Sequence, residues 1–307
     1  MEDLSRMRVL VLGGLSFDTI VYLDALPPPV PHTVTATRFH ETIGETGAGK
    51  ALNLEKLGFH VAFHALLGAD ALGDRLAATL QHHGIDFIRE PDPRGTRRHV
   101  NLMDASGDRL SISIAQEGPE PRIDHRPIES LLPECDYVVL NIDDYCRDLI
   151  QPIKAAGKEI WSDIHDYNGY NAYHQDFIAA ADYLFLSSDL LPDYRTFMER
   201  MRKLGKRLVV CTHGRDGSSA LSANSQWMEV PSLPDVPIRD TNGAGDAYFA
   251  GYLYGETRGY DVLRCMQLGT LVGGLCITSS ELAHPQLSRA WVETAWSKQY
   301  GGAARGM

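Results

Sequence analysis

At 240–246 the chain reads Asp240-Thr241-Asn242-Gly243-Ala244-Gly245-Asp246, and an apolar run follows at 247–253. This pattern predicts a buried helix that begins at the glycines. The first turn of a helix leaves backbone N–H groups unpaired and carries partial positive charge, so it binds anions such as phosphate. Because Gly243, Ala244 and Gly245 are small, the backbone can come close to the anion. The segment therefore predicts an anion site at the start of this helix.

Asp246 places a carboxylate inside the predicted anion-binding turn, where electrostatics alone would disfavour it. A carboxylate in this position makes chemical sense as a general base that takes the proton of a hydroxyl group as it attacks phosphorus. The alternative is a glycine-rich turn that is simply capped by an acid, and the pattern alone leaves both interpretations open.

Outside this motif, short apolar segments alternate with helical stretches along the chain. Such alternation is typical of right-handed βαβ units and of a parallel sheet that helices cover on both faces. The predicted strands are Val9–Leu12, Val61–Ala65, Tyr137–Ile142, Glu159–Ser162, Tyr183–Leu186 and Leu208–Cys211. The predicted helices include Leu72–His83, Cys146–Ala156, Leu190–Leu204, Ala244–Tyr254, Val262–Ser279 and Gln286–Lys298.

Two insertions, at residues 17–46 and 96–116, interrupt the alternation. The first contains the β-rich segments Thr19–Tyr22 and Thr33–Thr37, and the second predicts a hairpin around Ala105–Asp108. The arms of the hairpin alternate apolar and polar residues, so one of its faces is apolar. We expect a half-polar β-sheet attached to the α/β body. An added edge of the main sheet is the alternative.

The motif at 240–246 resembles the C-terminal signature of the ribokinase-like (PfkB) carbohydrate kinases, Asp-Thr-x-Gly-Ala-Gly-Asp followed by a helix with Phe-x-Gly, here Phe249–Gly251. The similarity extends along most of the chain. Leu10–Asp18 resembles the family's first strand with its sugar-contacting aspartate, and Cys211–Gly217 is similar to the nucleotide-binding Thr-x-Gly-x-x-Gly. Leu67–Gly73 also matches the family pattern.

This resemblance implies a single ribokinase-like domain over residues 1–307, a three-layer α/β sandwich with a central, mostly parallel sheet and a small β lid. It implies ATP-dependent phosphorylation of a primary hydroxyl of a pentose or hexose, with Asp246 as the base and N–H groups at 243–246 as an anion hole. A lid of this kind often pairs with a second subunit, so a homodimer through the lid is expected. The alternatives are a nucleoside kinase on the same fold and a non-catalytic sensor of sugars or nucleotides.

The same resemblance, together with the predicted carboxyl ends of the strands, assigns the remaining site residues. The acceptor substrate is expected to contact Asp18, Gly44, Gly47, Gly49, Asn141 and Asp163. The nucleotide is expected to contact Thr212, Gly214, Gly217 and Thr241. The implied cofactors are ATP and Mg²⁺, with a monovalent cation beside Asp240 and Thr241 in some relatives.

Residues 44–51, Gly-Glu-Thr-Gly-Ala-Gly-Lys-Ala, nearly match a P-loop, which would make the protein a P-loop ATPase instead. A P-loop requires a Ser or Thr hydroxyl after its lysine to bind Mg²⁺, and Ala51 has none. A P-loop also follows a buried strand, whereas the segment 39–43 is short and polar. We therefore favour the substrate loop of the kinase resemblance and expect Lys50 to act, if at all, on the acceptor.

Three departures from the family pattern mark this chain. Glu45 replaces the second glycine of the substrate loop and Gly49 replaces its asparagine, so Glu45 or Lys50 would supply other contacts to the acceptor. The family's magnesium-organising Asn-x-x-Glu is absent, since Ser187 and Leu190 stand at its two positions. Either the adjacent Asp189 substitutes, or the nucleotide and water hold Mg²⁺. No metal ligand is assigned.

Composition points to a cytoplasmic enzyme. The net charge of −11 over 307 residues argues against nucleic-acid or anionic-membrane partners, and no apolar stretch is long enough to span a membrane. Met1-Glu2-Asp3 does not begin a signal peptide. The five cysteines are odd in number and widely spaced, which predicts reduced thiols in the core.

Overall fold

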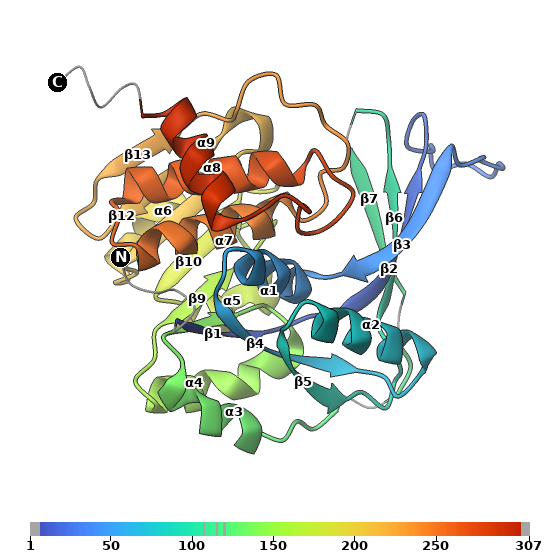
Figure 1. The fold of residues 1–307 in the computed structure, drawn as a ribbon, viewed down its shortest axis with the longest axis horizontal. Coiled ribbons are helices and arrows are strands. Elements are labelled where there is room, and N and C mark those ends of the chain that lie inside the picture. Colours follow the sequence, from blue (N-terminus) through green and yellow to red (C-terminus); the bar gives the residue numbers. More distant parts are fainter. Residues whose placement is uncertain (1–6, 107, 115, 119–120, 302–307) are drawn as a thin grey trace.

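A computed structural model describes residues 7–106, 108–114, 116–118 and 121–301; Met1–Asp3 and Gly107, which enter two of the sequence predictions, lie outside these ranges. The strands of the main sheet are β1 (Arg8–Leu12), β4 (His60–Leu67), β5 (Asp86–Pro91), β8 (Tyr137–Leu140), β9 (Ile160–Asp163), β10 (Tyr183–Ser187), β11 (Leu208–Thr212), β12 (Ser218–Ser222) and β13 (Trp227–Val230). Within the described residues their order is β13-β12-β11-β10-β9-β8-β1-β4-β5 (Figure 1). Neighbours from β11 to β5 pair parallel, whereas β12 and β13 pair antiparallel, which confirms a mostly parallel central sheet.

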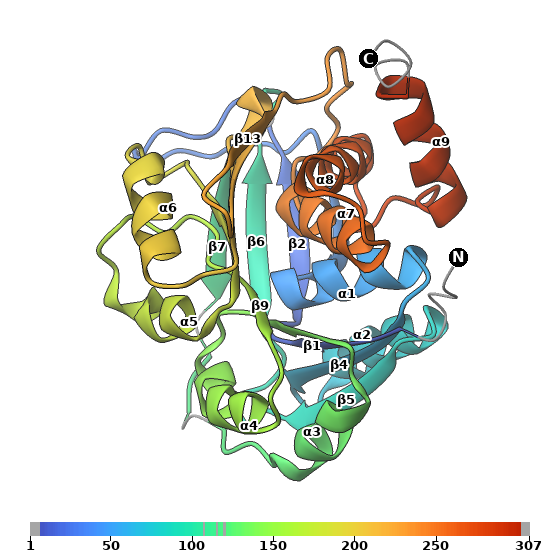
Figure 2. The same ribbon diagram turned by 90° about the vertical axis from the view of Figure 1, so that its left-hand side faces the viewer.

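Helices cover both sides of this sheet, as Figure 2 shows. One side carries α1 (Thr46–Lys56), α2 (Ala71–His82), α7 (Ala244–Thr257), α8 (Val262–Cys276) and α9 (Arg289–Gln299), and the other carries α3 (Arg126–Leu131), α4 (Ile150–Ala155), α5 (Gln175–Ala180) and α6 (Tyr194–Lys203). Along β1, Val9 and Val11 face the first layer of helices, whereas Leu10 and Leu12 face the second. A strand buried on both faces is apolar at every position, which explains why β1 was readable from the sequence.

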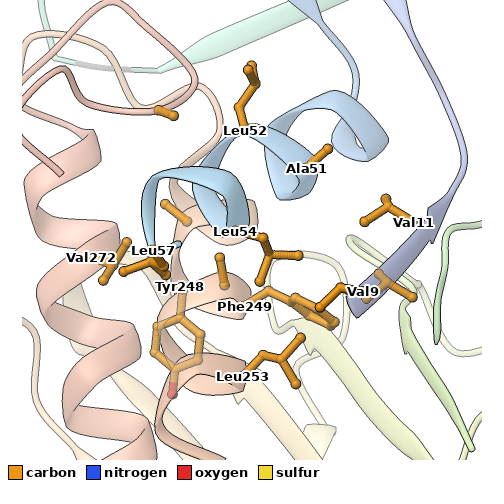
Figure 3. Packing of buried hydrophobic residues seen from close by; sticks show 14 of the residues in the cluster. Val9, Val11, Ala51, Leu52, Leu54, Leu57, Tyr248, Phe249, Leu253 and Val272 are labelled. Atoms are coloured by element: carbon orange, nitrogen blue, oxygen red, sulfur yellow. The ribbon is translucent and has the colours of Figure 1, made fainter. Parts of the chain in front are cut away.

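The helices α1 and α7, which carry the two glycine-rich segments, pack against each other in the core (Figure 3). Leu54 of α1 lies beside Phe249 and Leu253 of α7. Behind them α7 packs closely on α8, because a Cβ at Gly251 would lie only 2.7 Å from the carbonyl oxygen of Leu268. This apolar packing fixes the beginnings of α1 and α7 relative to each other, and the candidate site lies between them.

Four further strands form a separate sheet, β2 (Ser16–Tyr22), β3 (Arg38–Gly44), β6 (Arg98–Met103) and β7 (Arg109–Ile114), in the order β3-β2-β6-β7. Figure 1 shows it standing at one side of the main body. The predicted lid is therefore a sheet of its own rather than an added edge of the main sheet. Thr33–Thr37 forms no strand, because the extended partner of β2 begins only at Arg38, after a proline-rich connection.

Four predicted helices are shorter in the structure: α8 ends at Cys276 rather than Ser279, α9 begins at Arg289 rather than Gln286, and proline explains the other two. The segment predicted as Cys146–Ala156 is a 3₁₀ helix over Asp144–Leu149 followed by α4, since Pro152 has no N–H with which to continue one α-helix. The segment predicted from Leu190 begins as α6 only at Tyr194, because Pro192 disfavours helical geometry in the residue before it. Among the described residues no helix is both long and apolar enough to cross a membrane.

Candidate active site

Asp246 lies in the first turn of α7, as the sequence predicts. The residue before the helix is Gly243, whose φ of 78° is in the left-handed region that favours glycine. The Ala244 N–H donates to the carbonyl of Thr241 over 3.3 Å, whereas helix geometry leaves the N–H groups of Gly245 and Asp246 without intrahelical acceptors. The turn therefore offers backbone donors beside a buried carboxylate.

Lys50 is the principal partner of Asp246. The Lys50 side chain is 0% exposed, and its Nζ lies 2.5 Å from Oδ1 of Asp246 and 3.3 Å from Oδ2 of Asp163. The three residues come from α1, α7 and the end of β9, so three elements of the main body converge on one buried ammonium group. The sequence singled out all three residues but did not predict this contact.

The charges of this cluster depend on one another. Burial alone would raise the pKa of Asp163, but the charges of His165 and Lys50 lower it to about 2. Burial raises the pKa of Asp246, against the lowering effect of Lys50 and His165. Burial would lower the pKa of Lys50, but the two carboxylates raise it above its usual value. Lys50 is therefore a buried cation between two acids.

The departure at Gly49 has a steric cause at this place. A Cβ built on Gly49 would lie 2.5 Å from Oδ2 of Asp246, so an asparagine here would collide with the carboxylate. Gly49 thus contacts the candidate base, whereas the resemblance assigned it to the acceptor. At the other end of the same loop, a Cβ on Gly44 would collide with the carboxylate of Asp18. The loop at 44–49 connects the two buried acids.

Asp18 lies on β2 of the lid and is almost fully buried. It accepts hydrogen bonds from Ser16 Oγ over 2.5 Å and from Asn101 Nδ2 over 3.0 Å, and His99 Nδ1 lies 3.3 Å away. Burial opposes protonation of His99, but Asp18 and Glu45 raise the pKa of its imidazole. The sequence missed His99 and Asn101, because only the parallel pairing of β6 with β2 brings them beside Asp18.

Arg38, the first residue of β3, packs on Tyr22 at the end of β2. Its guanidinium stacks over the ring of Tyr22, 3.3 Å from the ring centroid. The Tyr22 hydroxyl donates to Oδ2 of Asp240 over 2.5 Å, and the N–H of Asn242 donates to Oδ1 over 2.8 Å. Both oxygens of Asp240 are thus engaged within the protein. These contacts connect Asp240 to the lid and to the loop before α7.

Glu45 extends the acceptor side of the site toward the main body. Its φ of 74° is unusual for a residue other than glycine, and its carboxylate lies 3.0 Å from Arg97 Nη1 and 3.5 Å from His99 Nε2. Burial and the charge of Asp143 raise its pKa, whereas Arg97 and His99 lower it. Arg97 also contacts Asp143 over 2.6 Å and lines a polar cavity of about 100 Å³ together with Tyr173. Strain of this kind persists where the surroundings over-determine it, often at a functional site.

The side chain of Asn141 makes two hydrogen bonds inside the protein. Its Nδ2 donates to the carbonyl of Leu12 over 2.8 Å, and its Oδ1 accepts from Thr46 Oγ1 over 3.2 Å. Gly47 approaches the chain at Gly14 closely, since an added Cβ would lie 2.6 Å from the Gly14 carbonyl oxygen. Both residues therefore hold the substrate loop against the end of β1, and their contact with an acceptor stays a prediction.

Of the four predicted nucleotide residues, Thr241 lies before α7, and the other three lie at the end of β11 and in the turn after it. Thr212 is the last residue of β11, and Gly214 and Gly217 both have positive φ, 55° and 95°, in the tight turn to β12. This turn is tied to α7 by a hydrogen bond of 2.9 Å from the Tyr248 hydroxyl to Ser218 Oγ. A direct hydrogen bond thus connects the predicted nucleotide turn to the helix α7.

The candidate magnesium residues lie at the end of β10 and directly after it. Asp189 and Leu190 are exposed, and Ser187 Oγ accepts a hydrogen bond from the Asp189 N–H over 3.2 Å. Within the described ranges no group of three or more His, Cys, Asp or Glu side chains is placed to hold a metal ion.

The P-loop interpretation does not fit this geometry. The strand before Gly44 is β3 of the lid rather than a central strand, and α1 begins at Thr46. Lys50 lies in the second turn of α1 and contacts two carboxylates, whereas a P-loop lysine reaches toward phosphate.

A parallel sheet with helices on both faces, an anion-binding helix start and a β lid over a buried carboxylate together define a ribokinase-like kinase fold. The chain belongs to the PfkB family of carbohydrate kinases, whose family model matches residues 7–289. It is 31% identical over 274 residues to the acarbose 7(IV)-phosphotransferase of an Actinoplanes strain, which covers 88% of this chain and 92% of that protein.

Solved structures agree with this membership. The microbiome-derived acarbose kinase Mak1 superposes with a TM-score of 0.84 at 27% identity, over 94% of this chain and 98% of that chain. A Burkholderia thailandensis nucleoside kinase in complex with inosine superposes with a TM-score of 0.78 over 95% of this chain and 99% of that chain. At 16% identity the second likeness shows the fold alone. The protein is therefore a kinase of the sugar and nucleoside kinase fold.

Proposed function

We propose that the protein transfers the γ-phosphoryl group of ATP to a primary hydroxyl of a carbohydrate, with Asp246 as the general base. The observation that carries this proposal is the buried Asp246 carboxylate in the first turn of α7, beside backbone N–H groups that lack intrahelical acceptors. The similarity to an acarbose phosphotransferase supports a carbohydrate as the acceptor and makes saccharides larger than a hexose part of the substrate class to be tested.

The chemistry uses few protein groups. Asp246 takes the proton of the acceptor hydroxyl while the oxygen forms its bond to the γ-phosphorus and the bond to the ADP oxygen breaks. The N–H groups of Gly245 and Asp246, with the dipole of α7, stabilise the charge on the transferring group. Thr212, Gly214 and Gly217 bind the nucleotide. Mg²⁺ would enter with the nucleotide phosphates.

The acceptor is bound between the lid and the main body. Asp18 already accepts hydrogen bonds from Ser16 and Asn101, and a carboxylate can accept further bonds from two neighbouring sugar hydroxyls. Such charge-assisted hydrogen bonds are stronger than neutral ones. Arg97 lines the polar cavity and contacts Glu45 of the substrate loop, so the two residues offer further polar contacts to a larger acceptor.

A turnover screen tests this function directly. The purified protein is incubated with ATP and Mg²⁺ and, in turn, with ribose, fructose, glucose, maltose, acarbose, adenosine and inosine, and ADP release is measured. We expect turnover with a carbohydrate, and NMR of the product should place the phosphate on a primary hydroxyl. Selective turnover of a nucleoside would establish a nucleoside kinase instead. Tight binding without turnover of any compound would favour a sensor.

We further propose that two copies pair through the outer face of the lid. On β7 the side chains of Leu110, Ile112 and Ile114 are 47%, 45% and 40% exposed, and Phe39 of β3 is 68% exposed. The strand register places Leu110, Leu102, Val21 and Phe39 in one row across the four strands, on the face opposite Asp18. Exposed apolar side chains on one face of a sheet, and on its edge strand β7, favour burial against a second lid.

Replacing Ile112 with Glu should convert the dimer into a monomer, because two carboxylates would meet in the paired lids without partners. Light scattering after size-exclusion chromatography measures the mass. The matched control is Leu204→Glu. Leu204 is an exposed aliphatic residue like Ile112, but it lies at the end of α6, away from the lid. A parent protein that is monomeric at all concentrations would contradict the dimer.

The cysteines support a reducing compartment such as the cytoplasm. Cys135, Cys146, Cys211, Cys265 and Cys276 are all buried free thiols, as the sequence predicts for the core. A protein with several buried thiols and no disulfide among them is typical of reducing surroundings. We propose the cytoplasm as its location on this basis.

A further inference from the structure

Lys50 has no role in the chemistry described so far, although it is the most completely buried cation of the site. Its ammonium group contacts Asp246 and Asp163, and its remaining side faces the ring of Phe249 at 5.3 Å from the centroid. The desolvation of an ammonium group is costly unless carboxylates and hydrogen bonds compensate for it. The chain therefore retains Lys50 at this place for its charge rather than for packing.

The two acids beside Lys50 explain why a cation is needed. Asp163 and Asp246 both lie within 3.3 Å of the same nitrogen atom, in surroundings that exclude water. Two carboxylates that share a buried space cannot both remain ionised without a compensating charge, so the pKa of one of them rises strongly. If Asp246 became protonated, it could no longer accept the proton of the acceptor hydroxyl.

Other groups around Asp246 do not replace Lys50. His165, in the loop after β9, lies 3.4 Å from Asp163 through its Nδ1, and its charge also lowers the pKa of Asp246, but less than the charge of Lys50 does. From α8, Cys276 adds no charge, because burial and the charge of Asp246 raise the pKa of its thiol to about 12. Asp240 adds a further negative charge, which Tyr22 and Asn242 engage. Lys50 is the cation that contacts Asp246 directly.

The geometry also divides the two oxygens of the carboxylate between two tasks. Oδ1 of Asp246 accepts from Lys50, whereas Oδ2 faces Gly49, where a side chain would collide with it. Glycine at position 49 and lysine at position 50 thus act together: the first lets the chain of α1 approach Oδ2 closely, and the second fixes Oδ1.

We propose that Lys50 is a positioning residue of phosphoryl transfer, which keeps Asp246 ionised beside Asp163 and holds its carboxylate in one orientation for the acceptor hydroxyl. This inference rests on the proposed role of Asp246 as the base. It assigns to the pair Gly49–Lys50 the function of preparing that base, and Asp163 holds the ammonium group in place rather than binding the acceptor alone.

The pH dependence of kcat distinguishes this role from simple packing. In Lys50→Met the side chain keeps its length but loses its charge, so the pKa of Asp246 should rise and the acid limb of kcat should move to higher pH. We expect a shift of at least about one pH unit, which corresponds to about tenfold lower activity on the acid side, with partial recovery in alkaline buffer. Titration with ADP should show unchanged nucleotide affinity, since Lys50 is not a P-loop lysine.

A second substitution provides a charge-based rescue. Adding Asp163→Asn to Lys50→Met removes the competing carboxylate, and the acid limb should return toward that of the parent protein. This double variant leaves one buried carboxylate without the ammonium group instead of two, so it should be less destabilised than Lys50→Met. Lys56→Met, in the last turn of the same helix, is the matched control and should leave the profile unchanged.

Two results would overturn the inference while leaving Asp246 as the proposed base. The first is an acid limb of Lys50→Met that coincides with the parent's while Asp246→Asn is inactive. The second is a double variant whose acid limb stays where Lys50→Met places it. Activity in Asp246→Asn would instead refute the proposed function itself, so the two failures are distinguishable.

Discussion

Asp246→Asn should lower kcat by about 10²–10⁴-fold while the fold and the affinity for ADP stay close to those of the parent protein. Asparagine has nearly the shape of aspartate, and its amide oxygen can still accept from Lys50, but the amide cannot take a proton. The loss therefore appears in kcat rather than in the acceptor KM, as is expected for an interaction that acts mainly in the transition state.

Steady-state kinetics with the best acceptor of the turnover screen measures this effect, and thermal denaturation checks the fold. Asp166→Asn is the matched control, because Asp166 is an exposed acid in the loop after β9 and the substitution makes the same change in charge. A kcat of Asp246→Asn within a few-fold of the parent value would exclude Asp246 as the general base.

Much of the main body could be predicted because its signals are local. The strand β1 is buried on both faces and is therefore apolar at every position, and α7 begins where a glycine-rich anion motif meets an apolar run. The antiparallel edge was not predicted, since β12 is Ser218–Ser222 and its small polar residues do not form an apolar run. Propensity alone cannot show that such a segment is buried.

The partners inside the site could not be predicted, because they depend on the folded chain. Lys50 and Asp246 are 196 residues apart in the sequence, and Asn101 reaches Asp18 from 83 residues away. One signal for the first contact was present: Gly49, directly before Lys50, replaces the usual asparagine of the family pattern. The collision of any Cβ at Gly49 with Asp246 shows why that glycine accompanies the ion pair.

Glu45 illustrates a departure that sequence reasoning could name but not explain. A position with φ of 74° is normally occupied by glycine, and the family pattern has glycine here. In this chain Arg97 and His99 hold the Glu45 carboxylate from the lid side, so ionic contacts stabilise a backbone conformation that the side chain disfavours. Only the folded arrangement reveals these partners.

Asp18→Ala should raise the KM for the carbohydrate acceptor by about 10²-fold and leave the KM for ATP almost unchanged. Two charge-assisted hydrogen bonds to sugar hydroxyls are each worth about 1.5–3 kcal/mol, and their loss accounts for an effect of this size. Asp18 lies on β2 of the lid, whereas the predicted nucleotide residues Thr212, Gly214 and Gly217 lie at the end of β11 and directly after it. The two substrates should therefore respond separately.

The test must separate lost binding from a disturbed lid, because Asp18 also receives hydrogen bonds from Ser16 and Asn101. Asp18→Asn retains a side chain of the same shape and should raise the acceptor KM less than Asp18→Ala does. Asp24→Ala, an exposed acid just after β2, is the control for charge and should change neither KM. If Asp18→Ala weakened acceptor and ATP equally, the lid as a whole would have lost its closed geometry, and Asp18 would not be the residue that recognises the sugar.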